Sequence, residues 1–304
     1  MIKLPFGVDI HNLIDDLRIL SWEAADLLLY YSKIAKDSSA EIEIIQNTKV
    51  DNPVTLADLE VNELIIQRIK GKYTDINWEI LSEEYAKNTS YKCDINSDWL
   101  WILDPLDGTK DCIQGTSDYA MHLALNYKRK PYLGIVLLPE KNELWIANGN
   151  GVWCERRDGS ISKPKIFKKK SLSNMTLVTS KNHRNQTLIN IIEKISFKKV
   201  SIIGSIGCKI ASIIRGDSDI YISLSLPDQS SPKDWDFAAP EAILKAAGGD
   251  ITYLNNKKLI YNNKNFEQPG IIIASNDKNT HKIICSEIKE IIKEYDLYPL
   301  HLLS

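Results

Sequence analysis

The sequence has few of the features that mark special classes of protein. Its five cysteines are scattered over 304 residues without a Cys-x-x-Cys pair, so we expect neither a disulfide framework nor a thiolate zinc site. No apolar run approaches the ~20 residues that a membrane-spanning helix needs. The first residues, Met1–Phe6, contain no apolar signal segment. We therefore expect a cytoplasmic protein.

A strong net charge is also absent. The formal charge is −2 at pH 7, so no overall field would attract a nucleic-acid polymer. The basic runs at 128–130 and 168–170 lie between strand-like segments without interleaved aromatic residues, which is typical of solvated turns. We expect neither nucleic acid nor membrane as a partner, and leave a homodimer open. No serine or cysteine lies in a Gly-x-Ser-x-Gly context that would indicate a covalent nucleophile.

Apolar periodicity predicts an α/β protein whose two halves differ. Residues 9–36 have the spacing of a long amphipathic helix. Short turns separate strand-like segments into an antiparallel meander over residues 119–154. Beyond a polar, basic stretch at 163–173, strands and helices alternate. We therefore predict an α+β N-terminal subdomain, residues 1–165, and an α/β C-terminal subdomain, residues 166–304.

The segment Trp99–Lys110 carries the clearest chemical signal. Five apolar residues suit a buried strand, and we expect the pair Asp104-Pro105 to end it, because proline lacks a ladder donor. Asp104 and Asp107 would then be two acids at a strand end, where a hard cation such as Mg²⁺ would compensate their charge. Gly108 and Thr109 follow at a predicted helix start, where backbone amides can hold a phosphate. Taken alone, the pattern fits a strand and an acidic turn equally well.

Three further motifs give this segment a context: Pro53–Asp58 (PVTLAD), Leu81–Glu84 (LSEE) and Asp234–Ala239 (DWDFAA). Together with Asp104–Thr109 (DPLDGT), they resemble the ordered pattern PVTxAD, GEE, DPxDGT and WDxAA of the inositol monophosphatase superfamily. Ser82 replaces the family's usual glycine. The members of this superfamily are Mg²⁺-dependent, lithium-sensitive phosphatases. The resemblance implies a layered αβαβα fold and two or three Mg²⁺ ions.

The resemblance also implies roles for individual residues. The metal ligands would be carboxylates and one backbone carbonyl: Glu83, Asp104, Leu106 through its carbonyl, Asp107 and Asp236, with Asp104 bridging two ions. Thr109 and Asp51 would orient and deprotonate the attacking water, with Asp58 nearby. The amides of Gly108 and Thr109 would hold the phosphate. From the residues alone, Asp58 fits a helix-capping role equally well, and we assign Asp234 to the helix dipole.

Within the superfamily, two features resemble the branch that removes the 3′-phosphate from 3′-phosphoadenosine 5′-phosphate, giving AMP. These are Lys110 directly after Thr109, and the GSxxxK segment formed by Gly204, Ser205 and Lys209. We therefore expect substrate contacts from Gly108, Thr109, Lys110, Gly204, Ser205 and Lys209. An inositol monophosphate or a sugar bisphosphate such as fructose 1,6-bisphosphate remains an alternative substrate. Lys209 could also be only a solvated helix residue. For each of the five histidines, including His122, we expect a satisfied or exposed ring without catalytic function.

Overall fold

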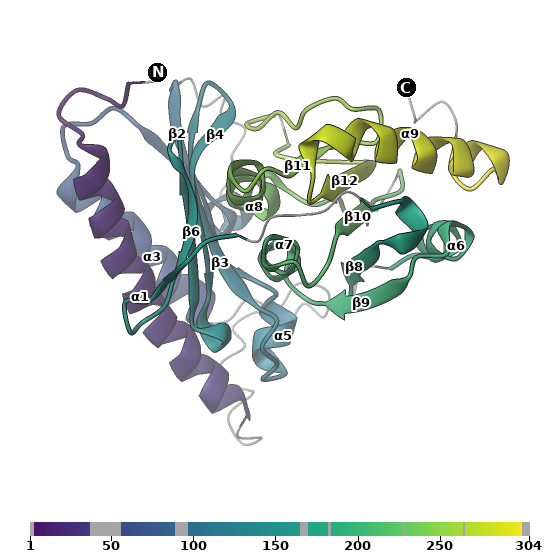
Figure 1. Cartoon of the computed structure of the whole chain (residues 1–304). Coiled ribbons are helices and arrows are strands. Elements are labelled where there is room, and N and C mark those ends of the chain that lie inside the picture. The colour runs from purple at the N-terminus through teal and green to yellow at the C-terminus, as the bar shows by residue number, and fades with distance from the viewer. Residues whose placement is uncertain are drawn as a thin grey trace.

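The chain folds into five alternating layers of helix and sheet. The computed structural model describes residues 3–36, 56–88, 97–164, 170–181, 184–227, 229–263 and 265–299. Helices α1 (Ile10–Lys36) and α3 (Leu56–Lys72) cover the outer face of one sheet (Figure 1). Helices α7 (Ile206–Arg215) and α8 (Asp234–Ala246) lie between the two sheets (Figure 1). The outer face of the second sheet packs against α6 (Gln186–Ile195) and α9 (Lys278–Glu294). The predicted αβαβα architecture is confirmed.

The first sheet has seven strands in chain order. They are β1 (Glu79–Ser82), β2 (Trp99–Asp107), β3 (Ala120–Tyr127), β4 (Lys130–Leu138), β5 (Glu143–Asn148), β6 (Gly151–Glu155) and β7 (Ile161–Ser162). β1 and β2 are parallel, and every later neighbouring pair is antiparallel, which confirms the predicted meander. Along β2, Trp101 and Leu103 pack toward α1 and α3, whereas Leu100 and Ile102 pack toward α7 and α8. The strand is apolar from Trp99 to Leu103 because both of its faces are buried there.

Our expectation that Asp104-Pro105 ends this strand is wrong. β2 continues to Asp107, and its register against β3 shifts between the pairs Asp104–His122 and Asp107–Ala120. Three steps on β2 therefore oppose two steps on β3, which defines a one-residue bulge. Pro105 lies inside the bulge, where the ladder is interrupted and its missing donor costs little.

The second sheet has the strand order β11-β12-β10-β8-β9. Its strands are β8 (Thr176–Ser180), β9 (Lys199–Ile203), β10 (Ile220–Leu224), β11 (Asp250–Tyr253) and β12 (Ile271–Ser275). β8 pairs in parallel with β10 on one side and with β9 on the other, and β12 runs antiparallel to β10 and β11. β7 ends at Ser162 and β8 begins at Thr176, and the division into subdomains at residue 165 stays a prediction.

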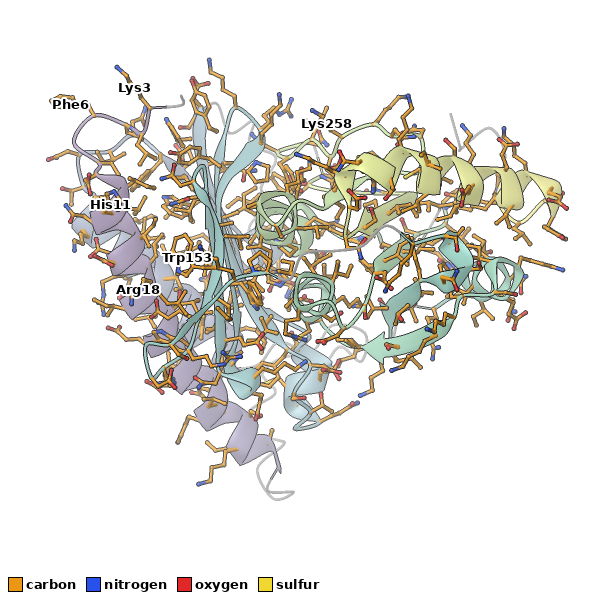
Figure 2. The ribbon with its side chains drawn as sticks, in the orientation of Figure 1. Lys3, Phe6, His11, Arg18, Trp153 and Lys258 are labelled. Atoms are coloured by element: carbon orange, nitrogen blue, oxygen red, sulfur yellow. The ribbon has the colours of Figure 1, made fainter. Side chains whose placement is uncertain are left out.

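Short helices complete the described chain: α4 (Glu83–Asn88), α5 (Thr109–Ile113), and the 3-10 turns η1 (Pro139–Lys141) and η2 (Leu172–Asn174). Side chains fill the layers between the ribbons (Figure 2). Exposed His11 lies on α1 at the outer edge of the molecule, away from α7 and α8 (Figure 2). No helix in the described ranges combines the length and apolarity needed to cross a membrane. The four described cysteines, at positions 112, 154, 208 and 285, are buried and form no disulfide.

The packing of α8 on β4 depends on Gly134. A Cβ at this position would lie 2.5 Å from Ala242 Cβ and 2.9 Å from the Ala239 carbonyl oxygen, both on α8. We expect Gly134→Ala to lower the free energy of unfolding by about 1–3 kcal/mol, because the helix must move away from the sheet. Urea unfolding measures this. Gly149→Ala is the matched control, because no atom lies within 4 Å of the position that its Cβ would take; equal losses in the two variants would contradict the prediction.

Candidate metal centre

Four predicted metal-ligand side chains converge where β1 and β2 end. Because the two strands are parallel, their carboxyl ends lie at the same edge of the sheet. Glu83 begins α4 directly after β1, and its side chain is within hydrogen-bonding contact of Asp104 on β2. Asp236, in the first turn of α8, completes the group. One oxygen each from Asp104, Asp107 and Asp236 lies within 4.8 Å of the others.

This arrangement concentrates negative charge in a buried place. Asp104 is 1% exposed. Its burial raises its pKa well above the usual range, and the charges of Glu83, Asp107 and Asp236 raise it further. The pKa of Asp236 is raised in the same way, mainly by burial and further by the charges of Asp107 and Glu83. Carboxylates that repel one another this strongly fit a hard divalent cation, whose charge compensates several of them at once.

The chain between the two β2 aspartates folds back on itself. The Leu106 amide donates to Asp104 Oδ1 over 3.1 Å, and the Thr109 hydroxyl donates to the Leu106 carbonyl over 3.0 Å. Gly108, with φ +92°, makes the turn into α5, and a Cβ there would lie 2.8 Å from the Asp118 carbonyl oxygen. The two hydrogen bonds of Leu106, through its amide to Asp104 and through its carbonyl to Thr109, therefore connect Asp104 to the turn.

The start of α7 contacts Asp107 directly. Asp107 Oδ2 accepts hydrogen bonds from the Ser205 hydroxyl at 2.7 Å, the Ile206 amide at 2.5 Å and the Gly207 amide at 3.2 Å. Ser205, which we predicted as a substrate contact, thus lies against a predicted metal ligand. Its role toward substrate stays a prediction.

Lys209, one turn further along α7, is not a solvated helix residue. Its side chain is 1% exposed, its ammonium donates to the Gly204 carbonyl, and its Nζ lies 5.3 Å from the centre of the Tyr221 ring. Burial lowers its pKa, an effect that nearby Asp107 opposes. The ammonium of Lys209 is therefore desolvated, and the nearby negative charges stabilise its charged form.

A cleft of about 860 Å³ connects these groups. Predicted site residues in its wall are Glu83, Asp107, Gly108, Thr109, Lys110, Gly204, Lys209 and Asp236. Lys87 and Lys233 also line it, so that lysines surround the acidic centre. The structure therefore brings three metal-ligand candidates, Glu83, Asp107 and Asp236, and most of the substrate-contact candidates to one cleft. The lining residues do not include Asp104, Leu106 or Ser205.

Two predicted catalytic residues are not placed in this cleft. Asp51 lies outside the described residues. Asp58 lies in the first turn of α3 and is buried, but it is not among the cleft-lining residues. Their roles stay predictions.

Asp234 does more than interact with a helix dipole, since its carboxylate accepts hydrogen bonds from the Asn262 amide and the Gln268 side chain. Burial raises its pKa to about 6.

Sequence reasoning missed two residues beside the carboxylates. His122, opposite Asp104 on β3, is buried with Nε2 3.4 Å from Asp107 Oδ2 and Nδ1 3.3 Å from the Trp235 carbonyl oxygen. Its burial lowers its pKa. Lys87 Nζ lies 2.9 Å from Glu83 Oε1. Residues four positions apart lie on the same face of a helix, so the spacing of Glu83 and Lys87 could have predicted their ion pair from the sequence. The position of His122 could not be predicted in this way, because it depends on the register between β2 and β3.

Comparisons with known proteins identify the family of the chain. The model of the inositol monophosphatase family matches residues 17–293. A 3′(2′),5′-bisphosphate nucleotidase CysQ from Buchnera aphidicola is 32% identical over 216 residues, covering 70% of this chain and 76% of the relative. The mouse 3′(2′),5′-bisphosphate nucleotidase 1 is 25% identical, covering 84% and 89% of the two chains.

Solved structures share the fold. The IMPase of Thermotoga maritima has a TM-score of 0.70 and 23% identity, covering 93% of this chain and 99% of its own. Inositol monophosphatase II of Staphylococcus aureus has a TM-score of 0.69 and 20% identity, covering 91% and 95%.

The family and the curated relatives define a phosphoric monoester hydrolase. The chain belongs to the inositol monophosphatase family.

The acidic centre should cost stability when no cation is bound. We expect Asp104→Asn to raise the free energy of unfolding in EDTA by about 1 kcal/mol or more, because it removes a buried charge and keeps the acceptor for the Leu106 amide. We expect Mg²⁺ to stabilise the unmodified protein but not this variant. Thermal unfolding with and without Mg²⁺ tests both points. Asp98→Asn, at an exposed aspartate, is the control, and an Mg²⁺ effect that survives Asp104→Asn would refute the assignment.

Proposed function

We propose that the chain is a Mg²⁺-dependent phosphatase that hydrolyses the 3′-phosphate of 3′-phosphoadenosine 5′-phosphate to AMP and phosphate. The observation that carries this proposal is the pairing, in one cleft, of a carboxylate centre with buried Lys209. Cations held by the carboxylate centre would bind the reacting phosphate, and the ammonium of Lys209 would bind the second phosphate of the substrate. The names of the bisphosphate nucleotidases to which the chain is similar support the same substrate.

The residues present fit two or three Mg²⁺ ions. Their ligands would be Glu83, Asp104, the carbonyl of Leu106, Asp107 and Asp236. Bound there, the ions would supply positive charge against the reacting phosphate and the attacking water.

The remaining work falls to side chains and amides of the chain. Because the Thr109 hydroxyl donates its proton to the Leu106 carbonyl, its lone pairs can accept a hydrogen bond from the attacking water and orient it. Asp51 would take the proton of that water. The amides of Gly108 and Thr109 would hold the phosphate at the turn into α5, with Lys110 at the rim.

Lys209 would bind the 5′-phosphate. Its ammonium is desolvated and its hydrogen bond in the described chain is to the Gly204 carbonyl, so a phosphate oxygen would be a stronger acceptor. The Gly204-Ser205 turn places this lysine in the same wall as Asp107. An inositol monophosphate, with a single phosphate, would leave the lysine without this partner.

We expect Lys209→Met to lower kcat/KM for the bisphosphorylated nucleotide by about ten- to a hundredfold, the value of a charge-assisted contact, and to change kcat/KM for 3′-AMP much less. Initial rates on both substrates measure the difference, with circular dichroism to confirm folding. Lys199→Met, at an exposed lysine on β9, is the control. Equal losses on both substrates, or faster hydrolysis of inositol 1-phosphate by the unmodified enzyme, would overturn the substrate assignment.

The metal proposal predicts an ion dependence. EDTA should abolish activity and Mg²⁺ should restore it. Because Li⁺ carries half the charge of Mg²⁺, its binding among the same carboxylates leaves more of their charge uncompensated, and we expect inhibition at roughly millimolar Li⁺. Rates at constant ionic strength with Li⁺ or Na⁺ test this. Equal inhibition by the two ions would count against the proposal.

A further inference from the structure

The two oxygens of Asp107 have different surroundings. Oδ2 is surrounded by donors from the start of α7: the hydroxyl of Ser205 and the amides of Ile206 and Gly207. Ser205 is also the N-cap of this helix, since its hydroxyl accepts from the Cys208 amide over 3.2 Å. One serine therefore joins the helix start to the carboxylate.

These hydrogen bonds to Oδ2 determine which oxygen of Asp107 is available to bind a cation. With three donors on Oδ2, the remaining oxygen, Oδ1, is the one free to serve as a ligand. The partial positive charge at the helix start also attracts the carboxylate. The side chain cannot rotate without breaking three hydrogen bonds, so its orientation is fixed before a cation arrives.

The sequence around Ser205 permits this close approach. A Cβ at Gly207 would lie 2.3 Å from His122 Nε2, and a Cβ at Gly204 would lie 2.3 Å from Asp111 Oδ2. Only glycines at these two positions let the first turn of α7 reach Asp107. His122 fills the space behind the carboxylate, 3.4 Å from Oδ2.

We propose that Ser205 is a positioning residue for the metal centre: its hydroxyl, with the first amides of α7, holds Asp107 in the orientation that binds the cation. This inference rests on the proposed function, because it assumes that Asp107 is a metal ligand. It assigns to Ser205 an effect on metal affinity that is separate from any contact with substrate.

The test is Mn²⁺ binding to the full-length protein without substrate, measured by calorimetry. We expect Ser205→Ala to weaken Mn²⁺ binding by about five- to tenfold, because one of three donors to Oδ2 is lost. Ser205→Thr, which keeps the hydroxyl, should restore most of the affinity. Ser212→Ala is the matched control: it removes another serine hydroxyl from α7, one that donates to the Lys209 carbonyl, and should leave Mn²⁺ affinity unchanged.

Kinetics separate positioning from substrate contact. For Ser205→Ala we expect a higher Mg²⁺ concentration at half-maximal rate, whereas loss of a substrate contact alone would raise only the KM for the nucleotide at saturating Mg²⁺. An unchanged Mn²⁺ affinity, with or without a raised KM for the nucleotide, would overturn the positioning role and leave the metal site intact. Absence of Mn²⁺ binding by the unmodified protein would instead overturn the proposed function, and the positioning role with it.

Discussion

The one-residue bulge in β2 is the constraint on which the site depends. In a regular strand, residues three apart point to opposite faces, so Asp104 and Asp107 would be separated by the sheet. The bulge at Pro105 reverses this alternation, which places Leu106 toward α1 and α3 and both carboxylates toward α7 and α8. A proline that would weaken a regular central strand is therefore tolerated at the position where bringing the two carboxylates to one face requires an irregular strand.

Backbone donors hold several of the carboxylates and leave most of their charge uncompensated. The Leu106 amide binds Asp104, the Lys233 amide binds Asp236 at 2.5 Å, and the start of α7 binds Asp107. Amides orient these oxygens without adding a full positive charge. Glu83 differs, because the ammonium of Lys87 neutralises part of its charge. The fold thus fixes the geometry of the centre at a cost in stability that a bound cation would offset.

Much of this could be predicted from the sequence, because the signals are local. The acids at the ends of β1 and β2, the helix start at Gly108 and the alternation of strands and helices after β8 follow from patterns a few residues long. The bulge could not, since it is defined by pairing with β3. For the same reason the contact between Ser205 and Asp107, 98 positions apart, was invisible, and the GSxxxK pattern suggested only a substrate contact. Burial of Lys209 depends on packing between two sheets, which no local pattern reports.

The layer formed by α7 and α8 joins the two sheets into one site. Both helices pack on the first sheet, α7 also packs on β8 and β10, and α8 on β11. Asp236 and Ser205 begin these helices and face the carboxylates of β2, whereas the cleft wall beyond them includes Tyr221 and Ser223 of β10. The predicted metal ligands and the part of the cleft wall on β10 therefore come from different layers that meet at the helix starts. Such a division lets residues of the second sheet change the shape of the cleft without displacing the carboxylates, which is a physical basis for different substrates on one fold.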